Sequence, residues 1–169
     1  MKKNYFLLLI LISISCYSQK ADLTSAIIAL DNKNDLQSAK KWIDVANEKI
    51  NSGSTFKKPK DLSKYLHYRG LIYLKSFQSD TVDVNFSLLQ TATDSFMDDV
   101  ELQSNFYKKS ISQLNICAYL FQDGAYKDYE SKDYDSALNK FSKSILINSS
   151  KGIEKVDTFN MYNAALMSY

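Results

Sequence analysis

The most regular alternation of apolar and polar positions along the chain lies between residues 134 and 147. Apolar side chains recur there at spacings of three and four residues, so they share one face of a helix. These positions are Tyr134, Ala137, Leu138, Phe141, Ile145 and Leu146. Asp133 precedes them, and its carboxylate is suited to capping a helix start by accepting hydrogen bonds from backbone N–H groups. The pattern predicts a helix from about Tyr134 to Ile147 with one buried face.

Related patterns extend over most of the remaining chain. The further predicted helices are 21–33, 34–50, 62–77, 86–102, 104–131 and 157–169. Asp35 and Asp157 are the expected N-caps of the second and the last of these helices. The segment 51–61 contains Pro59, the only proline, and is predicted to be a loop. The sequence therefore predicts an all-α fold in which consecutive helices form hairpins.

The segment 129–151 resembles the second half of a tetratricopeptide repeat, a helical hairpin that stacks into α-solenoids. Five of its residues match the family's motif positions: Tyr134, Ala137, Phe141, Ile145 and Ile147. Ser144 and Ser149 stand where the family usually has alanine and proline. In an earlier segment, Gly70 and Tyr73 match the glycine and tyrosine of a first repeat helix. The resemblance implies about three hairpins plus a terminal half repeat over residues 19–169.

Residues 1–18 have the layout of a secretory signal peptide. Lys2 and Lys3 are followed by an apolar run from 5 to 14 that is too short to span a bilayer, and then by small residues. Cleavage after Ser18 is predicted, which would make the protein periplasmic or secreted. The alternatives are a lipid anchor on Cys16, for which Ser13 fits poorly, and a buried N-terminal helix.

Composition and charge narrow the possible functions. The chain has only 4 glycines and 1 proline in 169 residues, which disfavours a β-sandwich or barrel with many tight turns. Removing residues 1–18 takes away two lysines and no acidic residue, which leaves 19 basic and 19 acidic residues. A neutral chain gives no electrostatic reason to expect nucleic acid as a partner. Lysine dominates and Arg69 is the only arginine, so the exported repeat proteins of Bacteroidota are the most similar type within the resemblance.

Candidate catalytic chemistry is sparse. His67 is the only histidine, and Cys117 lies in an apolar stretch where a buried thiol is expected. Asp98 and Glu101 are three residues apart and would share a helix face, an arrangement that is common on solvated surfaces. No nucleotide-binding, metalloprotease or serine-hydrolase motif occurs. We therefore expect a protein that is not an enzyme and that carries no cofactor or metal.

In the tetratricopeptide family, the inner helices line a concave groove that binds peptides or proteins. The resemblance implies that the groove positions here are Lys64, His67, Leu71, Tyr119, Gln122, Tyr126, Tyr129, Phe159 and Tyr162. Several are aromatic, as in binding hot spots, although the rings could instead pack between repeats. The family's carboxylate clamp is absent, because Thr24, His67, Gln122 and Tyr162 occupy its positions.

These features predict an exported scaffold or adaptor that binds a protein or peptide through this groove. The alternative is a solute- or glycan-capture component of an outer-membrane uptake system, and an enzyme with a repeat appendage is third. The segment 157–169 resembles a first repeat helix without its second helix. We expect it to expose some of Met161, Tyr162, Leu166 and Tyr169, so that either the natural chain continues or this helix mediates self-association.

Overall fold

The computed structural model describes residues 19–80 and 85–168, which contain seven helical elements and no strand. Residues 19–27 are α-helical and continue directly into a short π-helix, η1 (Ile28–Asn32). The remaining elements are α2 (Leu36–Asn51), α3 (Pro59–Ser79), α4 (Phe86–Leu102), α5 (Tyr107–Glu130), α6 (Tyr134–Asn148) and α7 (Thr158–Met167). The predicted all-α fold class is confirmed for the described residues.

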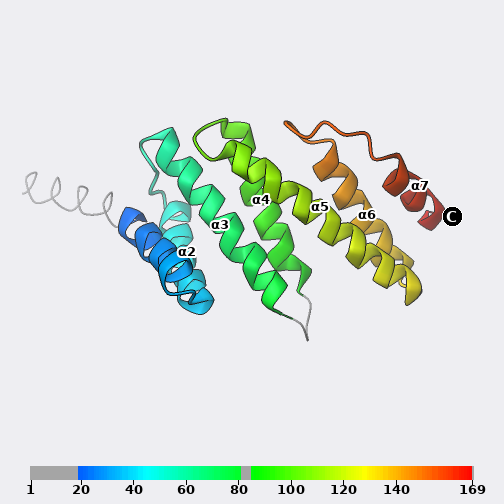
Figure 1. Ribbon diagram of the computed structural model, residues 1–169, viewed down its shortest axis with the longest axis horizontal. Helices are drawn as coiled ribbons and strands as arrows, with labels where there is room; N and C mark the ends of the chain where they lie inside the picture. The colour runs from blue at the N-terminus through cyan, green and yellow to red at the C-terminus, as the bar shows by residue number, and fades with distance from the viewer. Residues whose placement is uncertain (1–18, 81–84, 169) are drawn as a thin grey trace, which may run out of the picture.

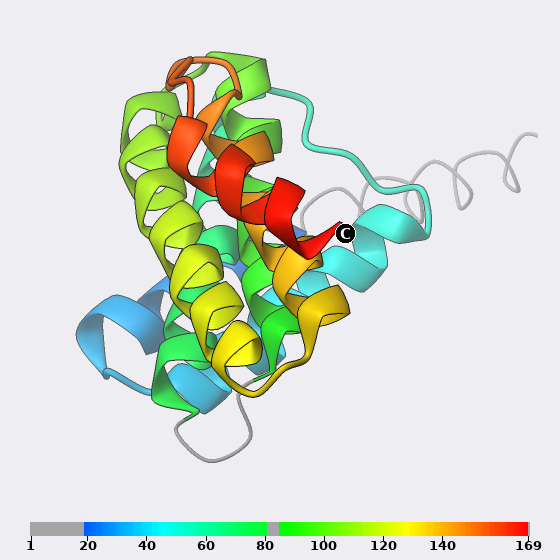
Figure 2. The ribbon, with the colours of Figure 1, turned by 90° about the vertical axis from the view of Figure 1, so that its right-hand side faces the viewer.

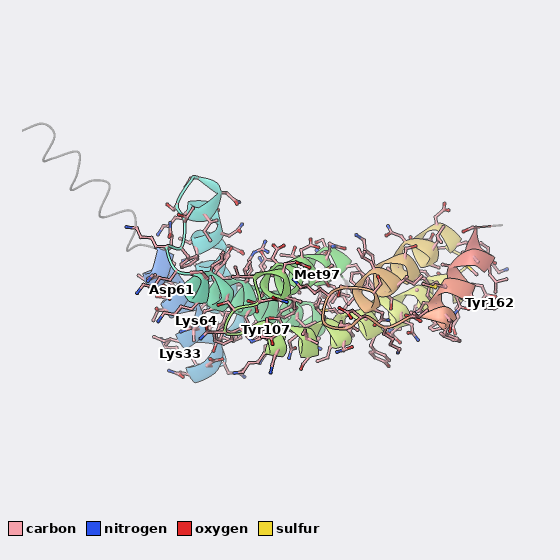
Figure 3. All side chains as sticks on the ribbon, turned by 90° about the horizontal axis from the view of Figure 1, so that it is seen from above. Lys33, Asp61, Lys64, Met97, Tyr107 and Tyr162 are labelled. Atoms are coloured by element: carbon pink, nitrogen blue, oxygen red, sulfur yellow. The ribbon has the colours of Figure 1, made fainter. Side chains whose placement is uncertain are left out.

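The helices stand side by side in one row that runs from the N-terminal segment to α7 (Figure 1). They pack mostly as consecutive antiparallel pairs, and α3 also contacts α5, the next helix but one. Viewed from above, Lys64 of α3 and Tyr107 of α5 lie on one side of the row, whereas Met97 of α4 lies on the other (Figure 3). The row is therefore two layers deep.

Three of the predicted helix starts have the expected caps. The carboxylates of Asp35, Asp133 and Asp157 each accept a hydrogen bond from the backbone N–H three residues later, at 2.9, 3.2 and 3.1 Å. The hydrogen bonds from Ser38 and Ser136 hold the pKa values of Asp35 and Asp133 below their ordinary value. These contacts satisfy N–H groups that have no partner within the helix.

Two helix boundaries differ from the prediction. The loop predicted at 51–61 is shorter, because α3 already begins at Pro59. Proline is well suited to the first turn of a helix, where its fixed φ is helical and its missing N–H is not needed. The helix predicted from residue 104 begins at Tyr107 instead, after Gln103 adopts a left-handed φ of 49° that ends α4.

The largest apolar cluster lies between α3, α4 and α5 and reaches Ile147 of α6. At its centre, the ring of Phe96 is fully buried against Gly70, where any Cβ atom would collide with the ring. A second cluster joins the N-terminal segment to α2 and α3. The third is small and contains only Ala125, Ala137 and Phe141 as fully covered members.

The buried face of α6 is more polar than its apolar pattern predicted. Tyr134 and Leu146 were expected on this face, but both are exposed. Ser144 and Asn148 are buried in their place, because they form hydrogen bonds with α7. The side of α6 that α7 covers therefore includes polar side chains.

Candidate functional site

Four of the predicted groove aromatics lie on α5 and α7, and two of them are in contact. Tyr119 is 64% exposed and Tyr129 is 47% exposed, both on α5, while Phe159 of α7 is 57% exposed. Tyr126 is half-buried and contacts the ring of Phe159, with the ring centres 6.2 Å apart. We call these four residues, Tyr119, Tyr126, Tyr129 and Phe159, the C-terminal aromatic strip.

Two hydrogen bonds fix the register of α7 on α5. The side-chain amide of Asn160 donates to Gln122 Oε1 at 3.1 Å, and that of Asn163 donates to the hydroxyl of Tyr126 at 3.1 Å. Residue numbers rise together along both helices, so α7 runs parallel to α5. Seen from the end of the row, α7 lies in front of α5 and α6 (Figure 2). The strip is thus built on two helices that hold each other in place.

Asn160 is the centre of a buried polar contact beneath α7. Its side-chain amide nitrogen lies 3.0 Å from Ser144 Oγ and 2.6 Å from Asp157 Oδ2. Asn148 also donates to Asp157 Oδ2, at 2.6 Å. Although burial opposes it, the hydrogen bonds from Asn160 and Asn148 hold the pKa of Asp157 below its ordinary value. These polar contacts give α7 a defined position on α6.

Tyr162 is the last of the predicted groove aromatics along the chain. It is 64% exposed and stands at the far end of the row (Figure 3). Phe159 and Asn163 are the residues of α7 that contact Tyr126 of α5. Tyr162 follows Phe159 by three residues on α7, so the two side chains are neighbours on the helix surface.

The three predicted groove residues of α3 do not join the strip. Lys64 is half-exposed, on the same side of the row as α5 (Figure 3). Leu71 is half-buried and packs against both large apolar clusters. His67 is buried, and its ring stacks on that of Phe106 with the centres 5.0 Å apart.

His67 belongs to a buried polar network that joins α3, α4 and α5. Asp99 has no exposed surface, and its carboxylate accepts hydrogen bonds from the hydroxyls of Ser63 at 2.5 Å and Ser110 at 2.6 Å. His67 Nδ1 lies 2.9 Å from Ser110 Oγ, and the backbone N–H of Phe106 donates to Ser63 Oγ at 3.0 Å. Burial and the charge of Lys109 lower the pKa of His67 to about 4, while burial raises the pKa of Asp99.

This network contains a serine, a histidine and an aspartate, the residue types of a hydrolase triad. Their hydrogen bonds do not connect them in the order that nucleophilic catalysis requires. In such a triad the histidine takes the proton of the serine and the carboxylate orients the histidine. Here Ser110 lies between the other two, donates its proton to Asp99 and is fully buried. The network was not predicted from the sequence, although Asp99 falls within the apolar stripe that contains Phe96 and Val100.

The other reactive or acidic groups considered from the sequence are either buried in the core or exposed on the surface. Cys117 is fully buried, and burial raises the pKa of its thiol to about 12. Asp98 and Glu101 are exposed, and Glu101 pairs with Lys151 at 3.3 Å. Within residues 19–80 and 85–168, no group of three or more His, Cys, Asp or Glu side chains is placed to hold a metal ion.

One cavity of about 490 Å³ lies where the end of α3 and the start of α4 meet α5 and α6. Phe77, Phe86 and Leu120 supply its apolar wall. Two ion pairs also line it: Lys127 with Asp123 at 2.7 Å, and Lys140 with Asp128 at 2.6 Å. Lys140 Nζ also lies 3.9 Å from the ring centre of Phe86.

None of the helices in the described part of the chain is long and apolar enough to cross a membrane. Comparison of the chain with known protein families, with curated proteins and with solved structures finds no match.

Proposed function

We propose that this chain is a tetratricopeptide-type helical repeat scaffold that binds a protein or peptide through the C-terminal aromatic strip. The observation that carries the proposal is the exposure of Tyr119, Tyr129 and Phe159 on helices that are fastened to each other. Row-like packing of antiparallel helices and the burial of Ala137 and Phe141 support the repeat assignment. The protein acts by holding a partner and catalyses no reaction.

The chemistry of the strip suits an extended apolar or aromatic peptide segment. Large rings bury much area at little cost in side-chain entropy, and tyrosine adds a hydroxyl that can bond to a peptide backbone. The four residues of the strip carry no charge at neutral pH, so binding should depend only weakly on salt. Because α5 and α7 are joined by the bonds of Asn160 and Asn163, the rings are held in position before the partner arrives.

A peptide-display library selected against the purified protein tests this proposal. We expect enrichment of peptides with apolar or aromatic anchors, and at least about tenfold weaker binding of those peptides to Tyr119→Ala and Phe159→Ala. Leu146→Ala is the matched control, since Leu146 is exposed on α6 outside the strip. Selection without sequence preference, or equal binding by the strip variants and the control, would contradict the proposal.

We further propose that the protein is exported with loss of residues 1–18. These residues lie outside the described part of the structure, so the proposal rests on their sequence alone. Sequencing of the N-terminus of the protein purified from its own cells should find Gln19 first. Recovery of Met1, or of a lipid-modified Cys16, would overturn it.

Capture of a small solute or glycan is a second candidate function, supported by the cavity between α3 and α6. Its volume is in the range of small-molecule sites, and it combines aromatic walls with fixed charges. A thermal-shift screen of sugars and amino acids should then give a ligand whose effect is lost in Gly124→Ala. Gly124 allows the ring of Phe86 to lie against α5, and a Cβ atom there would push the ring toward the cavity.

A further inference from the structure

A second pocket lies along the seam of the first helical hairpin, at the opposite end of the row from α7 (Figure 1). It lies between the N-terminal helical segment, including η1, and the first half of α2. Its volume of about 370 Å³ is at the lower end of the range of small-molecule sites. The pocket shares no residue with the cavity near α5 and α6 or with the C-terminal aromatic strip, so its role is independent of the functions proposed above.

The apolar part of this pocket includes a partly exposed indole ring. Trp42, the only tryptophan of the chain, is 38% exposed, and Ile28 is 42% exposed. Ala29 also lines the pocket and is buried. Lys41 Nζ lies 6.0 Å from the centre of the Trp42 ring, at the outer limit of a cation–π contact. The indole is therefore available to stack on an apolar face of a ligand.

Four polar side chains also line the pocket: Ser25, Lys33, Asp35 and Ser38. A lysine ammonium only donates hydrogen bonds, a carboxylate only accepts them, and a serine hydroxyl does both. Asp35 is held in place because it accepts a hydrogen bond from the backbone N–H of Ser38 at 2.9 Å. A carboxylate can accept about four hydrogen bonds, so this contact leaves capacity for a ligand. The pocket thus combines donors and acceptors with an aromatic surface.

The backbone beside the pocket is irregular. The N–H of Lys33 donates to the carbonyl of Ile28 at 3.2 Å and so forms the π-helical turn of η1. Such turns are rare and are found frequently at functional sites. Asn34 follows with a left-handed φ of 50°, and the N–H of Asp35 donates to the carbonyl of Ala29 at 2.9 Å. This turn fixes the backbone from which the two charged side chains of the pocket extend.

The charges of the pocket favour a neutral ligand. Lys33 and Asp35 have opposite charges and are two residues apart, so a simple ion would be attracted by one and repelled by the other. A sugar hydroxyl both donates and accepts, so it can pair with either side chain. The C–H groups on the face of a sugar ring form an apolar surface that can stack on an indole. A sugar ring therefore matches both parts of the pocket.

We propose that this pocket binds a neutral sugar ring, stacked on Trp42 and hydrogen-bonded through its hydroxyls to Lys33 and Asp35. The volume limits the bound part of a glycan to about one or two rings. Because such a ligand has few non-hydrogen atoms, its dissociation constant should be on the order of 1 mM.

The fluorescence of the protein tests the proposal directly, because its only tryptophan lies in the pocket. The purified protein is titrated to about 50 mM with glucose, galactose, mannose, xylose, N-acetylglucosamine and disaccharides built from them. At least one of these sugars should give a saturable change, and its affinity should be the same at about 0.05 and 0.5 M salt. Leucine, succinate and spermidine, which represent a zwitterion, an anion and a cation, should give none.

Two variants and a matched control show where the sugar binds, by ligand-observed NMR titration. Trp42→Ala should weaken binding at least about tenfold, and Asp35→Asn about fivefold, because a charged acceptor is lost. Asparagine is also a good N-cap, so the second variant keeps the start of α2. Ile116→Ala should bind like the wild type, since Ile116 is similarly exposed, at 39%, but lies on α5. Circular dichroism melting identifies any variant that fails to fold.

The absence of a saturable change with all of these sugars would overturn the proposal, as would a response to leucine, succinate or spermidine in place of a sugar. Unchanged sugar binding by a folded Trp42→Ala or by Asp35→Asn would also overturn it. If the selected peptides alter Trp42 fluorescence and no sugar does, the pocket belongs to the peptide surface instead. Tyr119→Ala should lose peptide binding and keep sugar binding, so the two proposals fail separately.

Discussion

The centre of the row and its C-terminal end are both held by buried polar groups, but these groups have different surroundings. Between α3, α4 and α5, the network of Asp99 adjoins a large apolar cluster that includes the fully buried Phe96. Beneath α7, the contacts of Asn160 adjoin a cluster with only three fully covered members. Apolar burial supplies most of the stability, whereas buried polar groups mainly fix position. The centre should therefore be stable, and α7 should be well positioned but weakly held.

The largest effect should come from removing the central ring. Phe96→Ala should lower the free energy of unfolding by about 3–5 kcal/mol, because it removes a fully buried ring and leaves a cavity beside Gly70. Urea unfolding followed by circular dichroism measures this loss. Leu146→Ala, at an exposed position, should change the value by no more than about 0.5 kcal/mol. A loss below about 1 kcal/mol for Phe96→Ala would mean that the centre is not the stable part.

Acid should weaken the centre through His67. Its pKa is about 4 in the folded protein, against an ordinary value of 6.5, so the unfolded chain binds a proton first as the pH falls. Stability that is complete above pH 6.5 should be lost between 6.5 and 4, by roughly 3 kcal/mol. The raised pKa of Asp99 acts in the opposite direction, since the folded protein then takes up that proton more readily than the unfolded chain.

Urea unfolding at several pH values, compared between the wild type and His67→Gln, isolates this effect. Glutamine keeps a donor for Ser110 but does not titrate, so the difference in stability between the two proteins should shrink as the pH falls from 6.5 to 4. A constant difference over this range would show that His67 does not keep its depressed pKa.

A moderate effect is expected where α6 meets the smallest cluster. Ala137 is fully buried with Ala125 and Phe141, so Ala137→Leu would overpack a close helix contact. We expect a loss of about 1–3 kcal/mol in a thermal or urea melt. An unchanged melting curve would show that the C-terminal end can rearrange around the larger side chain, and that Ala137 is less tightly packed than its burial indicates.

The substitution with the smallest expected effect on stability should distinguish the C-terminal end from the centre of the row most clearly. Asn160→Ala removes the amide that joins Gln122, Ser144 and Asp157, and should cost about 1 kcal/mol. Hydrogen exchange should show faster exchange in α7 and unchanged protection in α3 to α5. Asn163→Ala, which removes a single bond to Tyr126, should give a weaker form of the same result. Equally faster hydrogen exchange in α7 and in α3 to α5 would show that the two regions do not open independently.

Local features of the sequence predicted the helices well. The bounds of the helix at 86–102 and the caps Asp35, Asp133 and Asp157 agree with the structure, because periodicity and capping depend on nearby residues. The start of α3 was missed because proline is compatible with both a loop and a first helical turn.

The candidate site was predicted only in part, since it depends on contacts between distant helices. Tyr126 and Phe159 are in ring contact, whereas His67 is buried on α3 and does not share a surface with them. A pattern of apolar positions says which residues share a helix face, and does not say which neighbouring helix covers that face. For the same reason, the contact of Asp99 with Ser63 and Ser110 could not be inferred from any one helix.

The burial of Cys117 makes it possible to measure how often the centre of the row opens, in addition to its free energy of unfolding. It is the only free cysteine in the described part of the chain, and its thiol has no exposed surface. A thiol reagent in solution can reach it only during moments when α3, α4 and α5 separate. The rate at which the Cys117 thiol is labelled therefore reports how often these helices separate. No probe has to be introduced into the protein for this measurement.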